Sequence, residues 1–253
     1  MLRFIRTNQL LVFFALTFVV IGTAAFLGHR TQNEMLVLPG VLGPTIVAAL
    51  LVACLEGTAG LKSLFVDQMR FGFSPFWYLI TLLMIPAVVV VAITLGSILL
   101  NQEVVLGQPS VFPQIIFVII ISLGEEFGWR GYALPRLQQR YSALDSSLIL
   151  GLLWSFWHFP GYLIGTGVPL DMPFYLFMLW VIPATILMTW VYNNTSSVFA
   201  AILFHSSANM SFGLRLLPEQ TGERTTFAVF VALVWLCAIV VTVVYGPRHL
   251  RKR

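Results

Sequence analysis

Three short stretches of this sequence combine acidic, basic, imidazole and amide side chains that could carry out acid–base chemistry. They read "GEEFGWR", "WSFWH" and "HSSAN". Their six candidate site residues are Glu125, Glu126, Arg130, His158, His205 and Asn209. All six lie within or beside apolar runs, where lipid cannot solvate a charge. Ionisable groups in that setting indicate function by default, so these six residues are the first candidates for a site.

The spacing of these residues groups them into helix faces. Residues four apart share one face of a helix, and this spacing relates Glu126 to Arg130 and His205 to Asn209. Glu125 is rotated by roughly 100° from Glu126 on a helix, so the two carboxylates need not serve the same purpose. The sequence therefore predicts one face with an ion pair and another with an imidazole and an amide.

The set of side chains suits hydrolysis of a carbonyl compound. A buried carboxylate can act as a general base on water, and a histidine can hold that water or share its proton. A second histidine and an asparagine amide can donate hydrogen bonds to a developing oxyanion. Alternatively, Glu125, His158 and His205 could ligate a divalent metal such as zinc. No HExxH or GxSxG stretch is present, so a metal site would need ligands from three helices.

Each candidate also has a purely structural interpretation. Glu126 and Arg130 could be an ion pair that holds helices together. His158, His205 and Asn209 could form ordinary hydrogen bonds between helices. The set as a whole favours a site over these separate explanations. Three aromatic residues near His158 are interpreted as packing or lipid-facing residues: Trp154, Phe156 and Trp157.

The composition indicates the class of protein in which these residues lie. The 253 residues are 58% hydrophobic and 9% charged, whereas about a quarter of a soluble domain is charged. Apolar runs of roughly 18–25 residues, long enough to cross a bilayer, recur along the chain. We therefore expect an all-α, polytopic membrane bundle forming a single domain over 1–253. The eight expected spans are about 9–28, 38–56, 75–100, 111–129, 146–165, 173–193, 197–214 and 226–246.

The basic residues predict the orientation of the chain. With both termini in the cytoplasm, only Arg30, Arg215 and Arg224 of the 14 Lys and Arg residues lie outside. The net charge of +4 is then a topological signal, and no nucleic-acid partner is expected. We expect a multi-pass protein in the plasma membrane of a prokaryote.

This topology brings the candidates to one level. Counted at 1.5 Å per residue from Arg136, Ser146 and Ser196 on the cytoplasmic side, Glu125, His158 and His205 lie at depths of about 16, 18 and 14 Å. A single buried site needs this agreement in depth. It also needs the three helices to be neighbours, which the spacing alone does not establish.

The three stretches also carry a family resemblance. "EEFGWR", then "WSFWH", then "HSSAN", on separate spans within about 122–212, resemble the catalytic core of the CPBP intramembrane protease family. That family includes the type II CAAX prenyl endopeptidases and the Abi proteins linked to bacteriocin processing or immunity. The resemblance implies that Glu125 and His158 activate a hydrolytic water, while Glu126 and Arg130 complete and brace the first motif.

The resemblance further implies that His205 and Asn209 stabilise the oxyanion. It leaves open whether the cofactor is a divalent metal such as zinc or whether there is none. Trp154 stands where the family often has phenylalanine. Since both are bulky aromatic residues, we expect this difference to matter little.

We therefore predict an intramembrane endopeptidase that acts on a peptide or lipidated protein in the bilayer. Prenylated CAAX-type and bacteriocin-related substrates are the ones that the resemblance suggests. Two alternatives stand beside this prediction. One is a non-catalytic immunity or binding protein that keeps the polar site. The other is a proton-coupled transporter, which the absence of an internal sequence repeat disfavours.

Overall fold

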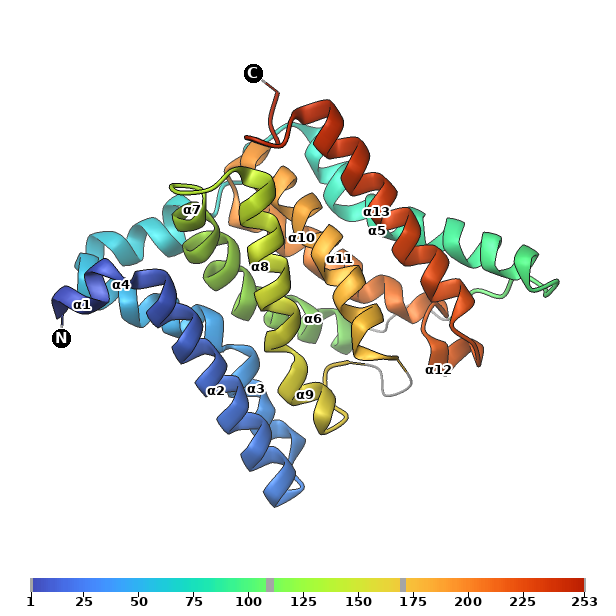
Figure 1. The fold of residues 1–253 in the computed structure, drawn as a ribbon, viewed down its shortest axis with the longest axis horizontal. Coiled ribbons are helices and arrows are strands. Elements are labelled where there is room, and N and C mark those ends of the chain that lie inside the picture. The colour runs from blue at the N-terminus through green and yellow to red at the C-terminus, as the bar shows by residue number, and fades with distance from the viewer. Residues whose placement is uncertain (1, 108–111, 169–171, 253) are drawn as a thin grey trace.

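The computed structural model describes residues 2–107, 112–168 and 172–252, and its elements are all helices in these ranges (Figure 1). The first part contains α1 (Leu2–Thr7), α2 (Gln9–Thr31), η1 (Glu34–Val37), α3 (Leu38–Val41), α4 (Gly43–Lys62), η2 (Ser63–Asp67) and α5 (Pro75–Leu99). The second contains α6 (Phe112–Glu126), η3 (Phe127–Ala133), α7 (Leu134–Leu137), α8 (Ala143–Trp157) and α9 (Phe159–Leu163). The third contains α10 (Phe174–Thr195), α11 (Val198–Ser211), η4 (Phe212–Leu214), α12 (Pro218–Thr221) and α13 (Thr225–Tyr245).

The expected all-α membrane bundle is confirmed. In the described ranges, five helices are long and apolar enough to cross a membrane: Gln9–Thr31, Gly43–Asp67, Pro75–Leu99, Phe174–Thr195 and Thr225–Tyr245. The other three expected spans correspond to the shorter helices α6, α8 and α11. Eight spans with both termini in the cytoplasm therefore stay a prediction.

The outer helices expose apolar side chains. Leu11 on α2, Ile98 on α5 and Val243 on α13 are all exposed. A continuous apolar surface of this kind is unfavourable in water and marks a surface that another apolar phase covers. The surface therefore fits acyl chains around the bundle.

The helix α10 forms the centre of the bundle. It contacts α8, α11 and α13, and these helices surround it in Figure 1. Two-thirds (67%) of its most apolar window is buried, against 33% for α5 and for α13. A helix that is apolar on all sides is normally buried in this way. It forms the wall against which two helices pack: α8, which ends just before His158, and α11, which carries His205.

The second long helix continues beyond the expected boundary near residue 56. α4 turns sharply at Gly57, whose φ of 67° and ψ of −156° suit glycine, and continues into η2. Leu64 is buried, and the ring of Phe65 lies 4.9 Å from that of Phe127. The apolar side of this segment thus packs against η3, because η3 offers it an apolar surface of its own.

Gly128 on η3 lies where two backbones touch. A Cβ atom at this position would overlap the backbone carbonyl of Pro44 on α4. Gly22 on α2 has no such neighbour within 4 Å. Small residues allow membrane helices to approach closely, and this contact fixes α4 against the segment that follows the two candidate glutamates.

We expect Gly128→Ala to lower the free energy of unfolding by about 1–3 kcal/mol, because neither backbone can move without disturbing its helix. Gly22→Ala is the matched control and should be neutral or slightly stabilising. Thermal unfolding of both variants in the same detergent measures the difference. Equal unfolding midpoints for the two variants would show that this contact is not tight.

Candidate active site

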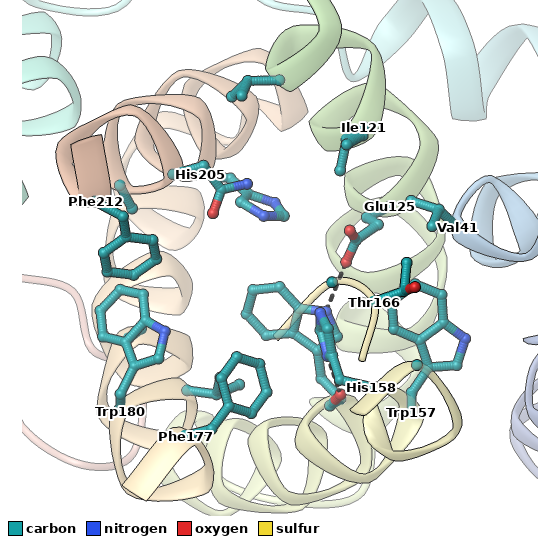
Figure 2. A pocket seen from close by; sticks show the side chains of 18 of the residues that line it. Val41, Ile121, Glu125, Trp157, His158, Thr166, Phe177, Trp180, His205 and Phe212 are labelled. Atoms are coloured by element: carbon teal, nitrogen blue, oxygen red, sulfur yellow. Dashed lines mark hydrogen bonds between the residues drawn. The ribbon is translucent and has the colours of Figure 1, made fainter. Parts of the chain in front are cut away.

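A cavity of about 310 Å³ lies among the inner helices, and four of the six candidate residues line it. These four are Glu125, His158, His205 and Asn209. Most of the remaining wall is aromatic or aliphatic, as at Trp157, Phe177, Trp180, Val181 and Phe212. Figure 2 shows Glu125, His158 and His205 pointing into the same space from three sides. The tertiary structure thus makes α6, α11 and the end of α8 neighbours, as a single site requires.

Glu125 lies in the last turn of α6 and is 2% exposed. Its Oε2 accepts a hydrogen bond of 2.7 Å from Nε1 of Trp154 on α8 (Figure 2). A hydrogen bond to a charged acceptor is stronger than one between neutral groups, and it fixes the direction of the carboxylate. Glu125 therefore presents a held carboxylate to the cavity.

The interpretation of Trp154, in the stretch "WSFWH", as a packing or lipid-facing residue is wrong. It is buried, and its ring lies under the guanidinium of Arg130, with 4.4 Å from Cζ to the ring centroid. Its ring also meets that of His205 edge to face, at 5.3 Å. Trp154 is thus a site residue that the sequence analysis missed. The available signal was its position four residues before His158, together with an indole N–H that phenylalanine lacks.

The other two aromatic residues of this stretch, Phe156 and Trp157, differ in their surroundings. Trp157 is buried, lines the cavity, and its ring centroid lies 4.9 Å from that of His158. Phe156 is 44% exposed on the opposite side of α8. The interpretation as a packing or lipid-facing residue therefore holds for Phe156, whereas Trp157 forms part of the wall of the site.

His158 occupies the break between α8 and α9. The sequence predicted one span over 146–165, but α8 ends at Trp157 and α9 begins at Phe159. Pro160 gives the reason, because proline lacks an N–H and its ring clashes with the carbonyl four residues earlier. The imidazole therefore sits at a helix end, where it can turn into the cavity.

The hydrogen bond of His158 fixes its tautomer. Its Nδ1 lies 2.8 Å from the carbonyl oxygen of Trp154. A carbonyl oxygen can only accept, so Nδ1 carries the hydrogen and donates it. In the neutral ring, Nε2 then has a free lone pair and acts as an acceptor.

Glu126 and Arg130 form the ion pair that their spacing predicted, behind the cavity wall. Arg130 Nη1 donates to Glu126 Oε1 over 2.9 Å, and both side chains are 0% exposed. Arg130 Nη2 also lies 3.1 Å from the sulfur of Met188. The same Glu126 Oε1 lies 2.8 Å from Nδ1 of His205. Glu126 thus contacts both Arg130 and His205, and its contact with His205 joins α6 to α11.

Small polar residues fix the position of α11. Ser206 donates to the hydroxyl of Ser122 on α6 at 3.0 Å. Ser207 donates to the carbonyl of Leu82 on α5 at 2.7 Å. These bonds lie between His205 and Asn209 in the sequence, so they set the rotation of the helix that carries both residues. Hydrogen bonds of this kind commonly join helices inside membranes.

The first motif continues into a π-helix. The seven residues of η3 are all buried, and they include Arg130 and the close-packing Gly128. Short π-helical segments within α-helices frequently occur at functional sites, because they change the direction of side chains relative to a regular helix. In this chain, the π-helical segment begins at Phe127, directly after Glu125 and Glu126.

The three candidate metal ligands do not form a recognisable metal centre. Within residues 2–107, 112–168 and 172–252, no group of three or more His, Cys, Asp or Glu side chains is arranged to hold a metal ion. Glu125, His158 and His205 line one cavity, yet both histidines use Nδ1 for other partners. The metal thus stays a prediction from the sequence.

Residues 107–211 match the family model described as type II CAAX prenyl endopeptidase Rce1-like. This stretch is similar to an Rce1-like domain. It contains all six candidate residues, and the resemblance expected from the three motifs is confirmed.

A named relative resembles the chain beyond the Rce1-like domain. The chain is 29% identical over 244 residues to a protein named CAAX prenyl protease 2 from Methanococcus maripaludis, covering 86% of this chain and 88% of the relative. The chain is an integral, multi-pass membrane protein and an intramembrane protease. A relative from an archaeon agrees with the expected plasma membrane of a prokaryote.

Proposed function

We propose that this chain is a glutamate-type intramembrane endopeptidase, in which Glu125 and His158 activate water against a peptide bond. The observation that carries the proposal is one apolar cavity lined by a held carboxylate, an imidazole with a free Nε2 and, on α11, a second imidazole with an amide. A water-excluding cavity strengthens every electrostatic interaction inside it.

Water activation follows from the hydrogen-bonding capacities of the two groups. The carboxylate of Glu125 only accepts hydrogen bonds, and Nε2 of neutral His158 also accepts. A water molecule can donate one hydrogen to each of them, which leaves an oxygen lone pair directed at the substrate. Glu125 then takes one proton as the oxygen attacks the carbonyl carbon.

The remaining steps use α11. Attack on the carbonyl gives a tetrahedral intermediate with a negative oxygen, to which the amide N–H of Asn209 can donate. His205 lies with Nδ1 against Glu126, which leaves its Nε2 facing the substrate oxygen beside this amide. The carbon–nitrogen bond then breaks, and protonated Glu125 returns its proton to the leaving amine. Atoms and charge therefore balance without any further reactant.

The substrate that we propose is a C-terminal peptide with a lipid-modified residue beside the scissile bond. The cavity wall is mainly aromatic and aliphatic, so it favours an apolar group close to Glu125. The name of the relative, CAAX prenyl protease 2, points to a prenylated cysteine as that group. A bacteriocin-related peptide is the other substrate class that the family resemblance suggests.

The test uses the purified protein in nanodiscs with a farnesylated CAAX peptide and the same peptide without its farnesyl group. Mass spectrometry of the products identifies the cleaved bond. We expect cleavage of the farnesylated peptide and little of the other. Cleavage of neither peptide, or of both at equal rates, would contradict the proposed substrate.

A second arm addresses the glutamate-type mechanism. Activity is measured after dialysis against a chelator, alongside elemental analysis of the same protein. We expect full activity at a metal content well below one ion per chain. Activity that is lost on chelation and restored by zinc would overturn the glutamate-type mechanism and favour the metal site predicted from Glu125, His158 and His205.

We also expect Trp154→Phe to lower kcat/KM by about 10- to 100-fold. The change keeps the aromatic ring but removes the N–H that holds Glu125, and a hydrogen bond to a charged group contributes about 1.5–3 kcal/mol. Peptide cleavage in nanodiscs measures the effect. Phe156→Leu, on the exposed side of the same helix, is the control and should retain full activity. Full activity in Trp154→Phe would mean that packing alone orients Glu125.

A further inference from the structure

A second cavity, of about 480 Å³, lies at the start of α2, away from the candidate active site. Its wall comes from the junction of α1 and α2, from α4, and from α7 and the residues after it. The lining residues are Arg6, Thr7, Asn8, Gln9, Leu10, Leu11, Glu56, Pro135, Arg136, Gln139 and Arg140. Gln9 is the first residue of a candidate membrane span. The cavity therefore lies at the level of the membrane surface, where lipid headgroups are found.

One of its three arginines is held in place by the protein. Arg136 Nη2 pairs with Glu56 at 2.6 Å, Nε donates to Gln9 at 2.9 Å, and Nη1 donates to the carbonyl of Tyr132 at 3.1 Å. Its guanidinium also lies over the Tyr132 ring, 3.8 Å from the centroid. This network joins three segments of the chain and neutralises the charge of Arg136. Arg136 therefore helps to form the cavity wall, and the net positive charge of the cavity comes from the other two arginines.

Arg6 and Arg140 carry the uncompensated charge. Both are exposed, and within the described part of the chain neither guanidinium has an ion-pair or hydrogen-bond partner. Glu56, the acidic residue of the wall, is already paired with Arg136. Guanidinium groups bind phosphate through paired N–H donors, so two free ones beside one cavity suit a phosphate ligand.

The cavity also has an apolar edge. Leu10 and Leu11 belong to its wall, and Leu11 is 63% exposed. Along the same helix, Val19 and Phe26 are exposed as well. A ligand with a phosphate in the cavity could thus extend an acyl chain along α2. A small free anion would make no use of this surface.

We propose that this cavity binds the phosphate of an anionic phospholipid headgroup, with the acyl chains lying along α2. Basic pockets between membrane helices at the level of the surface are suited to such headgroups. The proposal is independent of the proteolytic mechanism, because none of the six candidate site residues lines this cavity.

The test compares phosphatidylglycerol with phosphatidylcholine on the intact, detergent-purified protein. Native mass spectrometry counts bound lipids during titration with each. The variant is Arg6→Gln/Arg140→Gln, and the matched control is Arg248→Gln/Arg251→Gln, which removes two exposed arginines elsewhere. We expect the parent and the control to prefer phosphatidylglycerol, and the variant to lose roughly 10- to 30-fold of that preference. Each single variant should lose an intermediate amount, which keeps the test valid if the double variant does not fold.

Three results would overturn the proposal. The Arg6→Gln/Arg140→Gln variant could keep its preference, or the control could lose as much as the variant. Alternatively, millimolar inorganic phosphate could displace phosphatidylglycerol, which would identify a site for a free anion. Unchanged thermal unfolding of the variants confirms that a loss of preference reflects the cavity.

Discussion

Glu125→Gln is expected to lower kcat/KM by about 10²- to 10⁴-fold, the range that a positioned general base contributes. Glutamine keeps the size of the side chain and an acceptor oxygen for the indole of Trp154. It cannot take a proton from water. The variant should therefore fold and insert as the parent does and fail at the chemical step.

Single-turnover cleavage of the farnesylated peptide in nanodiscs separates this loss from a loss of binding. We expect peptide affinity to stay within a few-fold of the parent, because the apolar wall of the cavity is unchanged. Parent-like turnover in Glu125→Gln would remove Glu125 from the mechanism. It would favour the alternative in which the polar residues only bind a partner.

Glu126→Gln is expected to lower the free energy of unfolding by about 3–5 kcal/mol. The substitution is chemically the same as Glu125→Gln and lies one residue further along the chain. Glu126 and Arg130 are both fully buried, and removing one charge leaves the other without compensation. The carboxylate that holds Nδ1 of His205 is lost at the same time. Thermal unfolding of the Glu125→Gln and Glu126→Gln variants under identical conditions makes the comparison, and only the second should show a large drop.

A double variant separates the structural and catalytic consequences of this second change. In Glu126→Leu/Arg130→Met both charges are absent, so most of the lost stability should return, since apolar replacement of a buried pair is often close to neutral. Cleavage should remain impaired, because His205 no longer has its carboxylate partner. A double variant as unstable as Glu126→Gln would show that the pair contributes more than charge compensation.

Composition and hydropathy were enough to predict the class of protein and most of its helices. The runs at 9–28, 75–100 and 226–246 correspond to Gln9–Thr31, Pro75–Leu99 and Thr225–Tyr245, because bilayer thickness sets the length of an apolar helix. The pair of Glu126 and Arg130 was also predictable, since residues four apart on a helix must be neighbours. These features depend on local geometry alone.

Some differences from the prediction arise where local signals compete. The run at 38–56 is divided between α3 and α4, and α4 continues through the turn at Gly57. His158 lies in a break that Pro160 causes, although its neighbours are apolar enough for one continuous span. Hydropathy averages over about twenty residues, so it cannot register a break made by one glycine or one proline.

The partners of the residues within each site could not be predicted from local sequence patterns, because they come from distant segments of the chain. Trp154 meets Glu125 across 29 residues, and His205 meets Glu126 across 79. The surface cavity likewise joins the start of α2 to Glu56 and Arg136. The reason is physical: helix periodicity determines which residues share a face, whereas the choice of facing helix depends on packing around α10, which no local pattern encodes.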